Sequence, residues 1–260
     1  MDTAHTVLLG VIEGITEFLP ISSTGHLLIA EHWLGARSEL FNVGIQSGAM
    51  LAVLGVFWKR LLGLLDLGQV DNRDYVAKIA LAFVVTMIGG LTVKKLGWSL
   101  PEAMTPVALA LIIGGIAILV IERLVAPRPE NATVSWAGAF WVGACQILAA
   151  VFPGTSRSAA TIFAAMLAGT TQRAAATEFA FLVGVPTMFA ATGYEFMKIP
   201  KAQFAQESWG DFALGFVVSA VVAFIAVKWL LRYVQSHRFT VFAWYRIIAG
   251  IALLFIARQA

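Results

Sequence analysis

The sequence predicts an all-α polytopic membrane protein with six transmembrane helices plus two re-entrant helical hairpins, arranged as an inverted-topology repeat. Three observations predict this fold class. Of the 260 residues, 59% are hydrophobic and 13% charged, and the mean hydropathy is +0.82, far outside soluble globular usage. Six segments are apolar over roughly 20 residues. Two other apolar segments are broken near their middles by polar residues, glycine and proline.

Composition excludes several function classes. Cys145 is the single cysteine, so the chain has no disulfide framework of its own and a thiol metal site is not expected. The formal net charge of +3 is small and scattered, and we expect no nucleic-acid partner. No basic region precedes the first apolar segment, which indicates that this segment is not a cleaved signal peptide.

The first broken segment, Val7 to Leu34, is interrupted by "FLPISSTGH", and the second, Val134 to Ala168, by "FPGTSRS". Each leg is too short to span a bilayer alone. Irregular backbone at membrane depth is tolerated only where protein buries it or where it lines a wet cavity. We therefore expect two re-entrant hairpins whose tips meet inside the protein.

Six segments are long enough to cross a hydrocarbon core of about 30 Å as helices. Three follow the first hairpin and three follow the second. They run over Phe41–Trp58, Val76–Val93, Pro106–Ile121, Glu178–Phe196, Phe212–Leu231 and Val241–Ile256.

The two interruptions resemble each other, which indicates an internal duplication. Setting Pro20 against Pro153 brings Ser23 onto Ser156. A unit of one hairpin and three spans contains an odd number of crossings, so the second copy is inverted relative to the first. We predict a single membrane domain over 1–260, with a first repeat over 1–125 and a second, inverted repeat over 134–260.

The distribution of Lys and Arg predicts the orientation. The loops after the first, third and fifth spans carry the larger share, with Lys59, Arg123 and Arg232 among them. We expect that side to be cytoplasmic. Both termini and the mouth of the first hairpin then face outward.

Glu13 and Glu17 lie four residues apart in the first hairpin, so their carboxylates share one helix face about one turn apart. Carboxylates at membrane depth are costly and mark functional sites by default. The pair can hold a divalent metal, or it can divide into a metal ligand and a general base. The alternative is that one of them snorkels or caps a neighbour.

Ser22, Ser23 and Thr24 follow Pro20 and precede the second leg, where N-cap residues are expected. Capping needs one hydroxyl, not three. A helix N-terminus also offers unpaired N–H groups to a phosphate, and a serine can be a nucleophile if a base lies within reach. His26 could be that base, an acid for the leaving group, or a phosphate donor.

The second interruption opens another helix N-terminus. Gly154 frees the backbone, and Thr155 and Ser156 offer hydroxyl donors. Arg157 is the only charge there, and its fork geometry matches phosphate oxygens. A structural salt bridge from Arg157 to Glu13 or Glu17 is the alternative, and the two interpretations are compatible in the empty site.

Three further charged residues are weaker candidates. Arg173, Glu178 and Arg246 lie at or near predicted membrane edges. We expect structural pairing for each of them.

The stretches "EGITEFLPISSTGH" and "PGTSRSAATI" resemble, nearly residue for residue, the two signature motifs of the bacterial undecaprenyl-diphosphatase family, also called bacitracin-resistance proteins. "FNVGIQSGAMLAV" and "RAAATEFAFLVGVP" look like the segments that follow each motif. The resemblance implies an inner-membrane enzyme that hydrolyses undecaprenyl diphosphate to undecaprenyl phosphate and inorganic phosphate, recycling the lipid carrier of cell-wall synthesis. It implies a divalent cation, Mg²⁺ or Ca²⁺, as cofactor and a polyprenyl diphosphate lipid as partner, and a homodimer is compatible with it.

The resemblance also implies the roles of individual residues. The catalytic residues are Glu17, Ser23, His26, Glu13 and Arg157, and the metal ligands are Glu13 and Glu17. Ser22, Thr24, Ser156 and Arg157 are implied as phosphate-binding residues, and the helix N-terminus described above adds Gly154 and Thr155 to this set. Attack by Ser23 and attack by a metal-bound water both stay open, as does the choice between Glu17 and His26 as the base.

A lipid-phosphate flippase or transporter is the alternative function, because inverted repeats with paired re-entrant tips occur in transporters. A pure transporter needs charge compensation. It does not need a hydroxyl cluster beside a carboxylate pair and a histidine, and this difference favours the enzyme.

Overall fold

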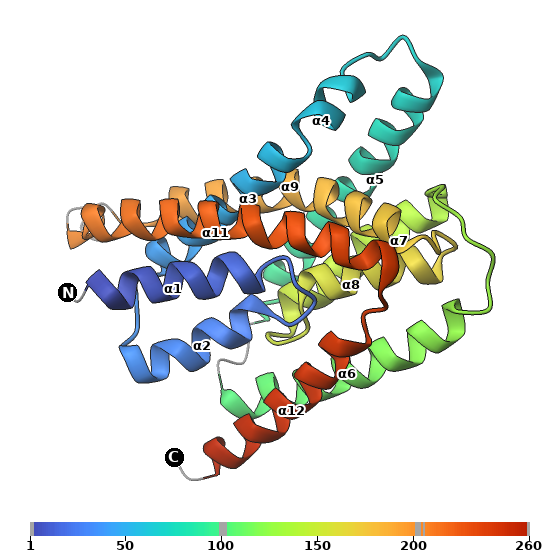
Figure 1. Ribbon diagram of the computed structural model, residues 1–260. Coiled ribbons are helices and arrows are strands. Elements are labelled where there is room, and N and C mark those ends of the chain that lie inside the picture. Colours follow the sequence, from blue (N-terminus) through green and yellow to red (C-terminus); the bar gives the residue numbers. More distant parts are fainter. Residues whose placement is uncertain (1–2, 99–102, 201–203, 205, 259–260) are drawn as a thin grey trace.

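The computed structural model describes residues 3–98, 103–200, 204 and 206–258, and this part of the chain is a bundle of helices without strands (Figure 1). Six of its helices are long and apolar enough to cross a membrane. They are α3 (Glu39–Val56), α5 (Val70–Lys95), α6 (Met104–Val125), α9 (Arg173–Lys198), α11 (Trp209–Ser236) and α12 (Thr240–Ala257). The six predicted spans are thus confirmed in number and order.

Several helices run beyond the ends expected from hydropathy. In α5 the first turn contains Asp71 and the last turn contains Lys94 and Lys95. Charges of these signs at these ends favour the helix dipole, so the helix continues past its apolar core. A short helix, α4 (Trp58–Leu64), was not expected. It follows α3 directly and projects from the bundle together with the start of α5 (Figure 1).

The two broken segments form two pairs of short helices, α1 (Thr3–Thr16) with α2 (Ser23–Leu34) and α7 (Trp136–Val151) with α8 (Arg157–Leu167). The pairs approach the centre of the bundle from opposite ends (Figure 1). Their tips meet there, where the hydroxyl of Ser158 donates a hydrogen bond to the carbonyl of Leu19 at 3.0 Å. This arrangement is compatible with two re-entrant hairpins.

Close helix packing relies on small residues, as in other membrane bundles. A Cβ atom at Gly10 of α1 would lie 2.9 Å from the carbonyl oxygen of Gly215 in α11, and one at Gly143 of α7 would lie 2.4 Å from that of Ala82 in α5. The first leg of each hairpin therefore packs against a long helix of the other half of the chain.

The outer surface of the bundle is apolar. Large side chains such as Ile113, Ile225 and Ile248 are more than half exposed. An exterior with this many exposed large apolar side chains suits a lipid environment. In the interior, aromatic rings pack at the hairpin junction, where Phe18 meets Phe181 edge-to-face with ring centroids 5.1 Å apart.

Candidate active site

Each hairpin tip ends in a serine that begins the second leg. Ser22 (φ 76°) and Ser156 (φ 70°) are the non-glycine residues with positive φ in the part of the chain that the structure describes. The hydroxyl of Ser22 accepts a hydrogen bond from the Gly25 amide at 3.3 Å, and that of Ser156 accepts one from the Ala159 amide at 3.3 Å. Both serines are N-caps held in a conformation that L-residues adopt at a cost.

These caps correct the predicted register of the two tips. The alignment on the prolines had paired Ser23 with Ser156, but the shared capping role pairs Ser22 with Ser156. The second tip contains one more residue after its proline. Gly154, with φ +91°, takes up part of that longer turn.

Glu17 joins the two tips chemically. Its carboxylate is buried, and its two oxygens have different partners. Oε2 accepts a hydrogen bond of 2.5 Å from the hydroxyl of Ser23, and Oε1 accepts one of 2.7 Å from Nη2 of Arg157. A carboxylate so placed can take the proton of the serine while the guanidinium fixes its orientation.

Arg157 has unused hydrogen-bonding capacity. Its Nε and Nη1 atoms are buried and have no hydrogen-bond partner among the described residues. Gly184 of α9 leaves space for the guanidinium, since a Cβ atom there would lie 2.1 Å from Nη1. Buried donors without partners are rare and costly. They indicate a place for an external acceptor such as a phosphate oxygen.

Among the described residues, Glu13 has buried acceptor atoms without partners, whereas Arg157 has buried donors without partners. Glu13 is fully buried, and neither carboxylate oxygen has a hydrogen-bond partner within the described chain. Within the same part of the chain, no group of three or more His, Cys, Asp or Glu residues could hold a metal ion. Mg²⁺, however, is usually held by one or two carboxylates, with waters and substrate phosphates completing its shell. The unpaired Glu13 next to Glu17 fits that donor set.

The matching position in the second hairpin lacks the charge. Gln146 of α7 lies as far after Gly143 as Glu13 lies after Gly10. Its amide nitrogen donates to the hydroxyl of Thr86 at 2.9 Å. A neutral amide thus occupies this position in the second hairpin, and the carboxylate occurs in the hairpin that carries Ser23.

His26 faces away from the serine. Its Nδ1 lies 2.6 Å from the carbonyl oxygen of Ser22, and since a carbonyl only accepts, this nitrogen carries the proton. Nε2 then accepts from the hydroxyl of Tyr245 at 2.6 Å. The described residues include no hydrogen bond between His26 and Ser23, whereas Glu17 accepts one from the Ser23 hydroxyl at 2.5 Å.

The remaining predicted site residues lie around the same junction. Ser156 contacts Ser158, with their hydroxyl oxygens 3.1 Å apart. Thr24 is exposed and Thr155 is half-buried. Neither threonine hydroxyl makes a hydrogen bond to any described residue, so both are open to a ligand.

Two of the three weaker candidates pair as expected. Arg173 binds Glu122 at 2.5 Å, and Glu178 binds Arg60 at 3.0 Å. Both ion pairs link helices outside the hairpin junction.

The expectation for Arg246 is wrong. It was placed near a membrane edge in a structural pair, but it is fully buried and has no salt bridge to any described residue. Instead it donates hydrogen bonds to backbone carbonyls of both tips, Pro20 at 3.1 Å and Gly154 at 2.9 Å. Its place in the middle of an apolar span is the signal that could have identified it.

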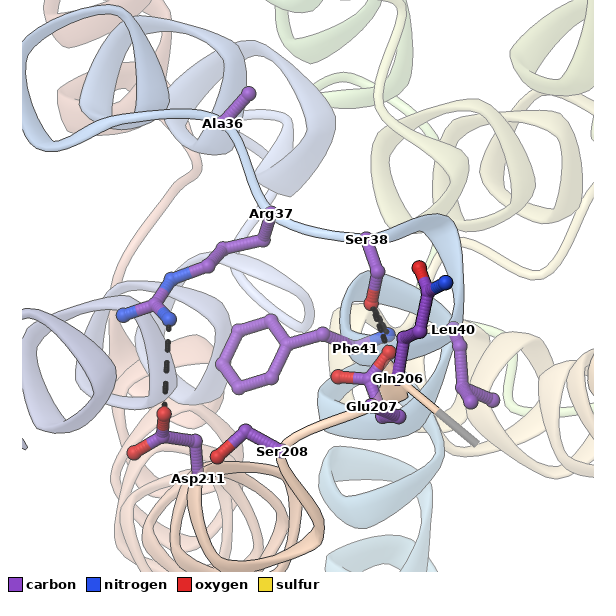
Figure 2. A pocket seen from close by; sticks show the side chains of 9 residues that line it. All are labelled: Ala36, Arg37, Ser38, Leu40, Phe41, Gln206, Glu207, Ser208 and Asp211. Atoms are coloured by element: carbon purple, nitrogen blue, oxygen red, sulfur yellow. Dashed lines mark hydrogen bonds and ion pairs between the residues drawn. The ribbon is translucent and has the colours of Figure 1, made fainter. Parts of the chain in front are cut away.

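A separate polar cavity of about 280 Å³ lies at the open end of the first hairpin (Figure 2). Arg37 and Asp211 face each other across it at 3.9 Å, and the hydroxyl of Ser38 donates to Glu207 at 2.7 Å. None of the predicted site residues lines it. These contacts tie the connection between α2 and α3 to the start of α11.

The fold and the junction define a polytopic membrane protein in which a buried carboxylate, a serine and an arginine meet between two hairpin tips. The chain matches the family of the bacitracin resistance protein BacA over residues 6–252, and it belongs to that family. It is 61% identical to an undecaprenyl-diphosphatase of Rhizobium etli over 256 residues, which cover 98% of this chain and 97% of that protein. It is 58% identical to an undecaprenyl-diphosphatase of Stenotrophomonas maltophilia over 255 residues, 97% of each chain.

Proposed function

We propose that this protein is an integral membrane phosphatase that hydrolyses undecaprenyl diphosphate to undecaprenyl phosphate and inorganic phosphate. The observation that carries the proposal is the pair of contacts of Glu17, one to the Ser23 hydroxyl and one to the Arg157 guanidinium. The relatives named undecaprenyl-diphosphatase, which match nearly the whole chain, support the substrate. Hydrolysis releases the monophosphate lipid, so the product is the carrier ready for another cycle of cell-wall synthesis.

The unpaired groups of the junction fit a diphosphate bound with a cation. The free donors Nε and Nη1 of Arg157 match phosphate oxygens, which only accept hydrogen bonds. The N-termini of α2 and α8 add backbone N–H groups and positive dipole ends. Thr24, Thr155 and Ser156 supply hydroxyls at the same two tips.

In the proposed reaction Ser23 attacks the terminal phosphorus. Glu17 removes the hydroxyl proton through Oε2, the bond between that phosphorus and the bridging oxygen breaks, and undecaprenyl phosphate leaves. Glu17 passes that proton to the departing undecaprenyl phosphate and is again a carboxylate. Water then attacks the phosphoserine: Glu17 takes a proton from the water and returns it to the serine oxygen as the bond from phosphorus to Ser23 Oγ breaks, which releases inorganic phosphate and the free serine. Direct attack by water on the diphosphate is the alternative route, and Glu17 would serve it as the same base.

Glu13 and Glu17 are the residues that would hold the divalent cation, Mg²⁺ or Ca²⁺. Such a cation neutralises charge on the phosphate oxygens as the phosphoryl group is transferred. The chain's own contribution is to bind and orient: the free donors of Arg157 would hold the terminal phosphate near Ser23, and the burial of Glu17 and Ser23 limits the access of bulk water.

The proposal includes an orientation. The protein is a multi-pass membrane protein, and we place the open end of the first hairpin and both termini on the outer face of the bacterial inner membrane. The excess of Lys and Arg in the opposite loops supports this. The start of α1 and the end of α12 lie at the same end of the bundle (Figure 1), as an even number of crossings requires.

Phosphate release from undecaprenyl diphosphate by the purified protein in detergent tests the function. Detergent removes any gradient, so a flippase or transporter would release no phosphate. We expect release by the wild type and loss of release in Glu17→Gln. Glu122→Gln is the matched control, because Glu122 is also a buried glutamate paired with an arginine but lies outside the junction. Equal release from Glu17→Gln and the control would remove the proposed site.

A further inference from the structure

Arg246 of α12 is a fully buried cation that has no carboxylate partner among the described residues. It is among the largest side chains that are completely buried, and the described chain contains no acidic residue within salt-bridge distance of it. A charge in this position must have its donors satisfied, because an unpaired buried ion is among the costliest groups in a protein. The identity of its partners therefore shows what the residue is for.

Those partners are four backbone carbonyl oxygens from three different segments. Nη1 donates to Pro20 in the first tip at 3.1 Å, and Nη2 donates to Gly154 in the second tip at 2.9 Å. Nη2 and Nε also donate to Ala110 at 3.0 Å and Leu111 at 3.3 Å, both in α6. One guanidinium thus satisfies a carbonyl from each tip, where the helices are interrupted, and also contacts two carbonyls within the continuous helix α6.

The surrounding glycines make this contact possible. A Cβ atom at Gly114 of α6 would lie 2.0 Å from Nη2 of Arg246. One at Gly154 would lie 2.7 Å from the carbonyl oxygen of Val107. Only glycine at both positions lets the second tip and the guanidinium approach α6 this closely.

The sequence positions of the two tip carbonyls give the contact its meaning. Pro20 lies midway between Glu17 and Ser23, three residues from each, and Gly154 lies three residues before Arg157. The guanidinium therefore holds the backbone on either side of the Glu17–Arg157 contact. Movement of one tip relative to the other would therefore disrupt at least one of the hydrogen bonds from Arg246 to the carbonyls of Pro20 and Gly154.

We infer that Arg246 is a positioning residue that holds the two hairpin tips in the register at which Glu17, Ser23 and Arg157 meet. The inference rests on the proposed function, because the register matters for phosphoryl transfer. Arg246 touches none of the three catalytic side chains by a hydrogen bond within the described chain. It acts through the backbone of both tips.

Arg246→Lys tests this inference, because lysine keeps the charge but has a single nitrogen in place of the planar fork. We expect kcat to fall by about 10²-fold, as for small misplacements of reacting groups, while KM changes by less than about threefold. Arg173→Lys is the matched control, an arginine that also joins two helices but lies outside the junction. It should leave kcat near the wild-type value.

A double-mutant cycle separates positioning from general destabilisation. If Arg246 acts by aligning Arg157 with Glu17, Arg246→Lys should cost little further activity once Arg157→Ala is present. Arg173→Lys should combine with Arg157→Ala additively. Full additivity of Arg246→Lys with Arg157→Ala, or wild-type kcat in Arg246→Lys, overturns the inference.

Hydrogen–deuterium exchange gives a readout that does not depend on activity. We expect Arg246→Lys to raise the rate of amide exchange in both tips, measured in peptides covering residues 18–24 and 152–158. Unchanged exchange in both peptides overturns the inference. If the wild type released no phosphate, the proposed function would fall, and exchange would still decide whether Arg246 holds the tips. If Arg246→Lys does not fold, Gly114→Ala displaces the guanidinium without removing it and is measured in the same way.

Discussion

Gly184 and Arg157 share one space in the protein: the guanidinium of Arg157 occupies the volume that any side chain at position 184 would take. The added Cβ atom would lie 2.1 Å from Nη1, far inside van der Waals contact. Because Nη2 of the same guanidinium binds Glu17, the glycine on α9 controls where the arginine of the second tip can go.

Gly184→Ala should therefore move Arg157 away from its contact with Glu17. We expect kcat/KM to fall by about 10-fold or more, since a hydrogen bond to a charged group contributes roughly 1.5–3 kcal/mol. Thermal stability in detergent should change much less than activity. Gly193→Ala on the same helix is the control, because nothing lies within 4 Å of a Cβ atom there. Wild-type activity in Gly184→Ala would show that Arg157 works from another position.

Glu17→Gln and Arg157→Ala should each lower diphosphatase activity by at least about 10²-fold, roughly 3 kcal/mol of transition-state stabilisation. Glutamine cannot take a proton from Ser23, and alanine removes the donors to the phosphate. Size-exclusion profiles and thermal unfolding would verify that both variants fold. Turnover close to that of the wild type in either one contradicts the mechanism.

Removal of divalent cations should abolish activity, and Mg²⁺ or Ca²⁺ should restore it. In Glu13→Gln the cation concentration for half-maximal activity should rise by about tenfold or more, because a carboxylate ligand is lost. Binding of Mn²⁺, followed by its magnetic resonance signal in the absence of substrate, gives the same comparison without turnover. Full activity in excess chelator rules out the proposed role of the cation.

Ser23→Cys tests the orientation and the nucleophile together, in a protein whose single cysteine has been removed by Cys145→Ala. A membrane-impermeant thiol reagent should label Cys at this position from the outer face of cells without their outer barrier, and a bound diphosphate analogue should protect it. Turnover should fall to a small fraction of that of Cys145→Ala, because a thiol differs from a hydroxyl in size and pKa. Labelling only from the cytoplasmic face would show that the proposed orientation is wrong. Undiminished hydrolysis would eliminate Ser23 as the nucleophile.

Local signals predicted most of the architecture. Each of the six spans is recognisable from a window of its own residues, and the glycines and prolines near Pro20 and Pro153 identify the breaks in the two hairpins. Helix ends were less accurate, since residues such as Asp71 and Lys95 are polar but favour the helix through its dipole.

The contacts between distant residues could not be predicted in the same way. That Glu17 and Arg157 would pair was one of two open interpretations, because their separation in sequence gives no distance. The single extra residue at Gly154 shifted the register of the second tip, and the alignment on prolines could not show this. The position of Arg246 within an apolar span could have indicated a buried charge, but its four partners could not be predicted, because they are backbone carbonyls, which no side-chain pattern identifies.

The exchange of partners between the halves also constrains how the protein is made. The first helix, α1, packs against α11, which begins at Trp209. During synthesis the chain leaves the ribosome from its N-terminus, so the first hairpin is inserted long before its partner exists. Until α11 is made, the first hairpin lacks the helix against which Gly10 and Gly14 of α1 pack. A chain that ended before Trp209 would contain the first hairpin, with its two glutamates, but not the helix that packs against it. The cell's quality control would recognise such a chain as an incompletely assembled membrane protein.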